Sequence, residues 1–132
     1  MVYVDTNVII DIIDDMSAKQ AACLEKLEEA LSQGQVFICD TVYAETSVGM
    51  SSREELDQVI TSLGLSRRTA SNDTLFRAGI AYRKYKQNTG PKNNVLPDFF
   101  IGAQAEVDTM PLITSDVKRM TGYFPNLVVI NP

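Results

Sequence analysis

Hydrophobic residues follow two alternating patterns along the chain. Short continuous apolar runs, which are typical of buried strands, occupy residues 2–4, 36–39, 111–114 and 127–130. Between these runs, apolar residues recur at helical spacing. Helices are therefore predicted over about residues 7–14, 17–33, 40 or 41 to 49, 52–63, 72 or 73 to 87, and 97–107.

Polar residues that favour helix ends support several of these boundaries. Ser17 is a good N-cap for the second helix, and Ser52 followed by Glu55 has the spacing of a capping box. Pro97 suits the first turn of a helix. The sequence NTGPKNN at 88–94 predicts a turn before the helix at 97–107.

The alternation of strands and helices predicts the fold class. It is typical of α/β proteins, here a parallel, twisted sheet of about four or five strands with helices on both faces. With 132 residues the chain is expected to form a single domain over 1–132. In such sheets, ligands bind beyond the carboxyl ends of the strands.

Composition removes several kinds of chemistry. The chain has no histidine and only two cysteines, Cys23 and Cys39, so neither a zinc site nor a histidine-based catalytic triad is expected. The two cysteines are predicted to be reduced and buried. No apolar run reaches the length of a membrane span or a signal peptide, so we expect a cytoplasmic protein with no membrane partner.

The charge is divided unevenly along the chain. The net charge of −5 argues against a nucleic-acid partner, because phosphates bind to cations. However, residues 1–66 carry 3 basic and 12 acidic side chains, a balance of −9, whereas residues 67–132 carry 9 and 5, a balance of +4. The second half therefore remains a candidate for contact with a polyanion.

Four carboxylates are expected at the carboxyl edge of the sheet. Asp5 and Asp116 follow predicted strands, Glu45 lies in the helix after the second strand, and Asp98 lies in the first turn of the helix at Pro97. Each also has a simple structural interpretation, as a helix cap, as a charge that suits the helix dipole, or as a solvated side chain.

Gathering all four acids requires a cation. Like charges a few ångströms apart repel by about 4 kcal/mol per pair at the effective dielectric constant of a protein surface. Oxygen ligands without imidazole or thiolate suit Mg²⁺ or Mn²⁺. Such an ion lowers the pKa of a bound water and stabilises charge on phosphate oxygens. Nearby Asn7, Thr114 and Ser115 are candidates to orient a ligand, or serve as plain caps.

The order and spacing of these segments resemble a protein family. Four segments are similar to the motifs of PIN domains: VYVDTNVIID, the glutamate of TVYAETSV, LPDFFIGAQA and PLITSDVKRMTGYFPNL. The chain looks like a toxin of the VapC type. The resemblance implies a PIN-like domain and a Mg²⁺-dependent or Mn²⁺-dependent endoribonuclease with an acidic quartet of Asp5, Glu45, Asp98 and Asp116. In this family pattern, Asp5 and Asp98 are the most direct metal ligands.

The resemblance also implies partners. Similar proteins are homodimers, are blocked by a cognate antitoxin, and cut structured RNA such as transfer RNA. Thr114 matches the family's hydroxyl residue and Asn7 the small polar residue of its first motif. Ser115 stands where many relatives carry a basic residue, so an aid to phosphate binding is missing at that position.

Basic residues in the second half have two interpretations. The candidate RNA contacts are Arg77, Arg83, Lys84, Lys86 and Lys92, with Tyr82 and Tyr85 between them. The same pattern also describes the solvated face of a long helix, with the tyrosines in the core or in a dimer contact.

Two other functions fit parts of the pattern. A PIN-fold binding module without cleavage would use the same fold, but loss of one or more acids would mark that case, and none is lost here. A magnesium-dependent phosphatase of the haloacid dehalogenase type would need a general acid two residues after Asp5, where this chain has Asn7.

Overall fold

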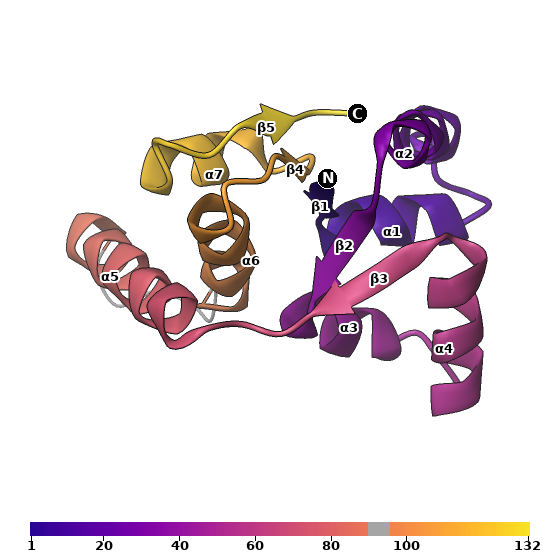
Figure 1. The fold of residues 1–132 in the computed structure, drawn as a ribbon, viewed down its shortest axis with the longest axis horizontal. Coiled ribbons are helices and arrows are strands. Elements are labelled where there is room, and N and C mark those ends of the chain that lie inside the picture. Colours follow the sequence, from indigo (N-terminus) through magenta and orange to yellow (C-terminus); the bar gives the residue numbers. More distant parts are fainter. Residues whose placement is uncertain (90–95) are drawn as a thin grey trace.

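The computed structural model describes residues 1–89 and 96–132, and these build a five-stranded sheet (Figure 1). The strands are β1 (Val2–Val4), β2 (Val36–Cys39), β3 (Leu65–Arg68), β4 (Leu112–Ile113) and β5 (Val129–Ile130). Their order across the sheet is β3-β2-β1-β4-β5, and every neighbouring pair is parallel. The predicted α/β class with a parallel sheet is confirmed.

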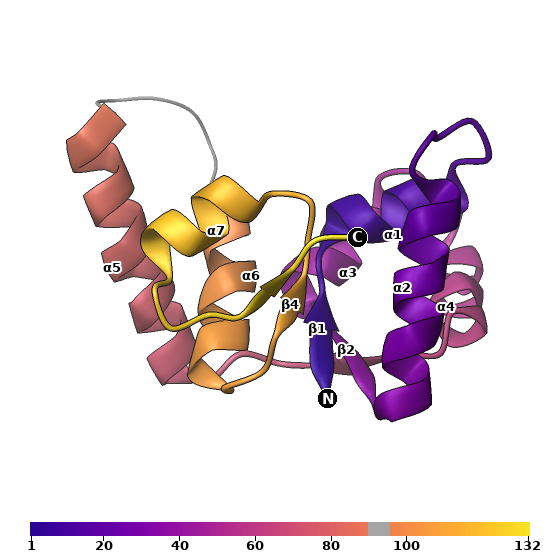
Figure 2. The same ribbon diagram turned by 90° about the horizontal axis from the view of Figure 1, so that it is seen from above.

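Helices cover both faces of this sheet, as predicted. They are α1 (Thr6–Ile13), α2 (Gln20–Gln33), α3 (Asp40–Ser47), α4 (Arg53–Ser62), α5 (Asn72–Thr89), α6 (Leu96–Val107) and α7 (Val117–Tyr123). Figure 2 shows α5, α6 and α7 on one side of the strands and α1, α2 and α4 on the other. The chain thus places its two halves on opposite faces, because right-handed crossovers in opposite directions from β1 lead to opposite sides.

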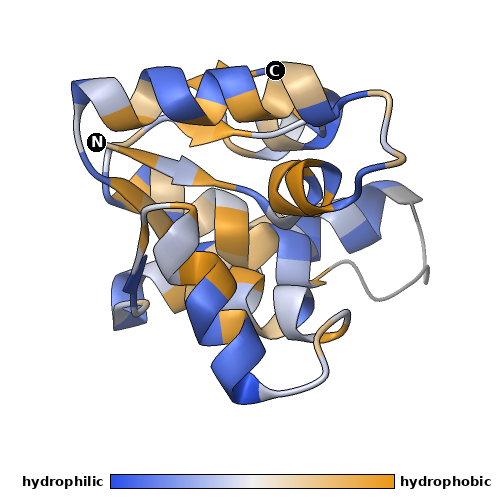
Figure 3. Cartoon of the chain, turned by 90° about the vertical axis from the view of Figure 1, so that its right-hand side faces the viewer, coloured by the Kyte–Doolittle hydropathy of each residue, from blue (hydrophilic) through white to orange (hydrophobic). Residues whose placement is uncertain are grey.

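The central strands β1, β2 and β4 are largely buried because helices cover them on both sides. All four residues of β2 are buried, and so are both residues of β4. Tyr3 of β1 lies in register between Phe37 and Leu112 and is almost fully buried. The surface helices alternate hydrophilic and hydrophobic residues along their length (Figure 3). Cys23 and Cys39 are free and buried, as expected. Among the described helices, none combines the length and the apolar character that a membrane span needs.

Local hydrogen bonds explain where several helices begin. The Ser52 hydroxyl accepts the Glu55 N–H at 3.1 Å, which is one of the two bonds of the predicted capping box at α4. The Glu55 carboxylate accepts the N–H of Ser51 instead of that of the N-cap Ser52. Helix α2 differs from its prediction, because it begins at Gln20 rather than at Ser17. The Ser17 hydroxyl instead accepts the N–H of Lys19 at 3.1 Å and shapes the turn before the helix.

Two elements have no counterpart in the sequence prediction. Strand β3 has one buried residue followed by three exposed ones, because it pairs with β2 alone at the edge of the sheet. Helix α7 buries only Met120, so its apolar periodicity is weak. The expected turn at 88–94 lies largely, and Lys92 entirely, outside the described residues.

Candidate active site

Asp5 lies at the carboxyl end of β1 and is 4% exposed. Its carboxylate accepts the Thr6 N–H at 2.7 Å, the Thr114 hydroxyl at 2.7 Å and the Asn7 amide at 3.2 Å. The bond to Thr6 makes Asp5 the N-cap of α1, which is one of the simple interpretations of this residue. The two side-chain donors on the other oxygen exceed what a cap requires.

Burial changes the protonation of this carboxylate. Desolvation raises the pKa of Asp5 to about 6, and the hydrogen bonds from Thr114 and Thr6 oppose that rise. The nearby carboxylates Asp98 and Glu45 add to it. The ionised form of Asp5 is therefore held at a cost that a bound cation would relieve.

Thr114 and Asn7 connect the ends of β1 and β4. The Thr114 hydroxyl is fully buried, donates to Asp5 and accepts the Asp116 N–H at 3.0 Å. The side-chain amide oxygen of Asn7 accepts the Ser115 N–H at 3.2 Å. Ser115 thus contributes its backbone here, while the residue lines a separate pocket of about 250 Å³ beside the last two residues of the chain. This network fixes the orientation of Asp5 relative to Asp116.

Glu45 reaches the site from the last turn of α3. Its carboxylate accepts the Thr6 hydroxyl at 2.7 Å. Thr6 therefore contacts two predicted site residues at once, since its backbone N–H donates to Asp5. Thr6 was not among the residues predicted for the site, although it directly follows Asp5 in VYVDTNVIID.

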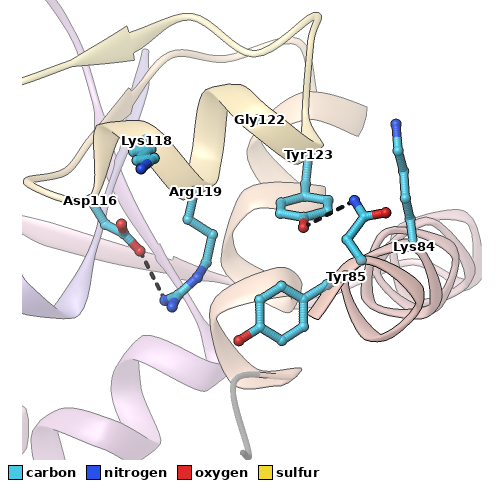
Figure 4. Close-up of a pocket in the computed structure, with 8 residues that line it drawn as sticks. Lys84, Tyr85, Asp116, Lys118, Arg119, Gly122 and Tyr123 are labelled. Carbon is cyan, nitrogen blue, oxygen red and sulfur yellow. Dashed lines mark hydrogen bonds and ion pairs between the residues drawn. The ribbon is translucent and has the colours of Figure 1, made fainter. Parts of the chain in front are cut away.

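Asp98 and Asp116 share a cation from the protein itself. The Arg119 guanidinium lies 2.8 Å from the Asp98 carboxylate and 3.0 Å from that of Asp116 (Figure 4 shows the Asp116 contact). Asp116 precedes α7 but makes no side-chain capping bond, so its carboxylate is not used as a cap. Sequence reasoning did not select Arg119, because its spacing of three residues from Asp116 on a short helix is an ordinary surface pattern.

Contacts link the four predicted acids in two pairs, since Thr6 bonds to both Asp5 and Glu45 and Arg119 pairs with both Asp98 and Asp116. Burial raises the pKa of Asp98, Arg119 lowers it, and both Glu45 and Asp116 raise it again. The pKa of Asp5 is in turn raised by the charges of Asp98 and Glu45. Carboxylates from the ends of β1 and β4 and from α3 and α6 therefore influence one another electrostatically at one edge of the sheet, where the topology predicted them.

The donor set suits a hard divalent cation. All four predicted ligands offer carboxylate oxygens, which Mg²⁺ and Mn²⁺ prefer. As the side chains stand, no three Asp, Glu, Cys or His residues within 1–89 and 96–132 form a group that could hold a metal ion. In this arrangement, the Arg119 guanidinium already pairs with the carboxylates of Asp98 and Asp116. The chemistry of the site fits the ion, and Arg119 competes for the same carboxylates.

Arg77, one of the candidate RNA contacts, is engaged inside the molecule. Its guanidinium pairs with Glu106 at 2.7 Å, donates to the Tyr123 carbonyl at 3.0 Å and lies 5.0 Å from the centre of the Phe124 ring. These contacts join α5 to α6 and α7. The guanidinium therefore has a structural role in this arrangement.

The other basic residues of α5 are exposed. Arg83, Lys84 and Lys86 all lie at the surface, and the Lys86 ammonium sits 5.7 Å from the centre of the Tyr82 ring. Tyr82 packs edge-on against Phe99, with ring centres 5.7 Å apart. The tyrosine thus belongs to the edge of the core, whereas the charges face solvent.

Comparisons with known proteins give the family and the fold. A family model described as the PIN domain matches residues 2–120. Among curated proteins, none matches the chain significantly.

Three solved structures illustrate the similarity of fold. VapBC2 from Rickettsia felis, bound to a DNA fragment from its promoter, has a TM-score of 0.74 at 21% identity, covering 99% of this chain and 98% of that one. A toxin–antitoxin complex from Klebsiella pneumoniae has a TM-score of 0.67 at 25% identity, covering 97% and 96%. VapC20 from Mycobacterium tuberculosis, a toxin that cleaves the sarcin–ricin loop, has 0.63 at 12%, covering 97% and 99%.

The family match extends over most of the chain and includes all four acids at the sheet edge. The structural matches cover nearly the full length of both partners in each comparison. The chain belongs to the PIN domain family.

Proposed function

We propose that this protein is a metal-dependent endoribonuclease that acts as the toxin of a toxin–antitoxin pair. The observation that carries the proposal is the linkage of the acids at one edge of the sheet, where Thr6 joins Asp5 to Glu45 and Arg119 joins Asp98 to Asp116. The PIN family match and the toxin structures with the same fold support it.

The acids would hold Mg²⁺ or Mn²⁺, with Asp5 and Asp98 as the most direct ligands and Glu45 and Asp116 completing the site. When bound, such an ion makes hydroxide available near neutral pH and stabilises charge on a phosphate. The protein's own contribution is positioning: Thr114 and Asn7 hold the Asp5 carboxylate, and Thr6 holds that of Glu45.

The partners follow from the same proposal. The substrate is RNA, with transfer RNA as the first class to test, and the inhibitor is a cognate antitoxin protein. The neighbours from Rickettsia felis and Klebsiella pneumoniae are toxin–antitoxin complexes, and VapC20 cleaves an RNA loop, which supports both partners. We further propose a cytoplasmic homodimer.

A binding module without cleavage is the second candidate. The pairing of Arg119 with Asp98 and Asp116 favours it, because these carboxylates are neutralised without a metal ion. A phosphatase with an aspartyl intermediate is disfavoured. The residue two positions after Asp5 is Asn7, whose amide donates to Asp5 and Thr114 and carries no acidic proton.

A cleavage assay separates the two candidates. Labelled total RNA is incubated with purified protein and Mg²⁺ or Mn²⁺, with chelator, and with an Asp98→Asn variant. Glu28→Gln, which removes an exposed acid on α2, is the matched control. We expect discrete cleavage by the wild type and the control, and none with chelator or with Asp98→Asn. Equal cleavage in every lane would mean contamination, and no cleavage of any RNA would favour the binding module.

A further inference from the structure

A pocket of about 530 Å³ lies between α5 and α7 (Figure 4). It borders the acidic cluster, which consists of Asp5, Glu45, Asp98 and Asp116. Its volume falls within the range of roughly 300–1,000 Å³ that is usual for small-molecule sites. Asp116 and Arg119 line this pocket, and Arg119 also pairs with Asp98. A ligand in the pocket would therefore lie beside the Asp116 carboxylate and the guanidinium that joins it to Asp98.

Cations dominate the lining of this pocket. Lys84 comes from α5, and Lys118 and Arg119 come from α7, against the single carboxylate of Asp116. Both lysines are exposed, and within 1–89 and 96–132 neither forms an ion pair. In a protein of net charge −5, this local excess of positive charge suits an anionic ligand.

Two aromatic rings complete the pocket. Tyr85 and Tyr123 meet edge to face, with ring centres 5.7 Å apart. Both rings also pack against the buried Phe99, at 5.4 and 5.3 Å, so their positions are fixed by the core. Rigid aromatic surface next to cations is the combination with which proteins bind single-stranded nucleic acid.

We propose that this pocket binds one nucleotide of the RNA strand next to the bond that is cleaved. The phosphate lies against Lys84 and Lys118, and the base contacts the rings of Tyr85 and Tyr123. The inference rests on the proposed ribonuclease function, because it places the scissile phosphate at the acidic site whose Asp116 borders the pocket. Of the RNA contacts expected from the sequence, the proposal includes Lys84 but not Arg77, whose guanidinium is engaged inside the molecule. It also includes Lys118, which lies on α7, a helix that the sequence did not predict.

The test measures RNA binding separately from cleavage. Fluorescein-labelled single-stranded RNA of mixed sequence is titrated with protein in chelator, and anisotropy is followed at several KCl concentrations. The variant is Lys84→Glu with Lys118→Glu. The matched control is Lys26→Glu with Arg53→Glu, which makes the same charge change on α2 and α4 across the sheet. Circular dichroism and melting curves verify that each variant is folded.

We expect the Lys84/Lys118 variant to bind at least about ten-fold more weakly than the control. The magnitude of the slope of log affinity against log salt should fall by about 0.7, since both lysines contact one phosphate and each lost phosphate contact removes about 0.7 for a single strand. As a second measurement that needs no variant, ultraviolet crosslinking of wild-type protein should attach RNA to peptides containing Tyr85 or Tyr123.

Equal binding by the Lys84/Lys118 variant and its control, or crosslinks confined to other peptides, would overturn the pocket, and so would a wild type that does not bind RNA. The outcomes also separate this inference from the function. Binding through the pocket without cleavage in Mg²⁺ or Mn²⁺ would leave the pocket standing and refute the nuclease. Cleavage by a wild type whose RNA binding ignores Lys84 and Lys118 would do the reverse.

Discussion

At the scale of single residues, Asp5 combines an ionisable carboxylate with almost complete burial. It is 4% exposed, accepts three hydrogen bonds and still has its pKa raised to about 6. Residues that oppose stability in this way are typical of functional sites. The places of the four acids at the end of the sheet were predictable from their positions after strands and in helices, and their role as the site stays a prediction. The contacts of Thr6 and Arg119 depended on neighbours that only the fold creates.

The raised pKa of Asp5 predicts how stability depends on pH. Between about pH 4 and pH 6 the folded protein retains a proton that the unfolded chain has lost, so stability falls as pH rises through this window. Asp5→Asn removes the effect. Without metal, it should be more stable than the wild type at pH 7.5, by roughly 1–3 kcal/mol.

Urea unfolding followed by circular dichroism from pH 4.5 to 8 measures this. Below about pH 6, the slope of stability against pH should be more positive in Asp5→Asn than in Glu28→Gln, because the negative contribution of Asp5 is removed. Identical slopes in both variants would show that Asp5 has an ordinary pKa in the folded protein.

Arg119 predicts a second effect at this scale. Because its guanidinium pairs with Asp98 and Asp116, it competes with any divalent cation for those carboxylates. Arg119→Gln should therefore bind Mn²⁺ roughly five-fold more tightly, which corresponds to about 1 kcal/mol for a partly exposed ion pair. Isothermal calorimetry on metal-free protein gives the affinity. Unchanged or weaker Mn²⁺ binding would mean that Arg119 does not compete.

At the scale of elements, apolar runs with helical or strand periodicity were predictable, and elements with weak periodicity were not. The strands 2–4 and 36–39 were predicted with the bounds that the structure gives. Strand β3 was missed because residues 66–68 are exposed at the sheet edge, and α7 because it buries one residue. The missed α7 carries Arg119 and Lys118, so part of the site was hidden with it.

The contact between α6 and α7 provides a test at this scale. A Cβ at Gly102 would overlap a ring carbon of Phe124 and lie 2.9 Å from the Met120 sulfur. Gly102→Ala should therefore destabilise the protein by about 1–3 kcal/mol through overpacking, in spite of the better helix propensity of alanine. Gly79→Ala on α5 is the matched control, since nothing lies within 4 Å of its Cβ.

Thermal or urea unfolding of both variants measures the difference. We expect Gly79→Ala to be neutral or slightly stabilising and Gly102→Ala to unfold earlier. If Gly102→Ala matched the control, α6 and α7 would not pack as closely as the structure has them.

At the scale of the whole molecule, the uneven charge along the sequence becomes an uneven charge in space. Helices α1 to α4 lie within residues 1–66, which have a balance of −9, and α5 to α7 lie within residues 67–132, which have a balance of +4. Two of the basic residues of the second half, Arg67 and Arg68, lie on β3 instead of on these helices. Figure 2 shows α5, α6 and α7 on one side of the strands and α1, α2 and α4 on the other. The acidic cluster lies at the sheet edge between them. RNA is therefore expected to approach from the side of α5 and α7.

The central claim is that this edge holds a divalent cation. Crystals soaked in Mn²⁺, with anomalous differences recorded at the manganese edge, test it most directly. We predict an anomalous peak at about 2.0–2.3 Å from carboxylate oxygens of Asp5 and Asp98, with the Arg119 side chain moved away. A fully soaked crystal with no peak at these residues, or with a peak only elsewhere, would contradict the account.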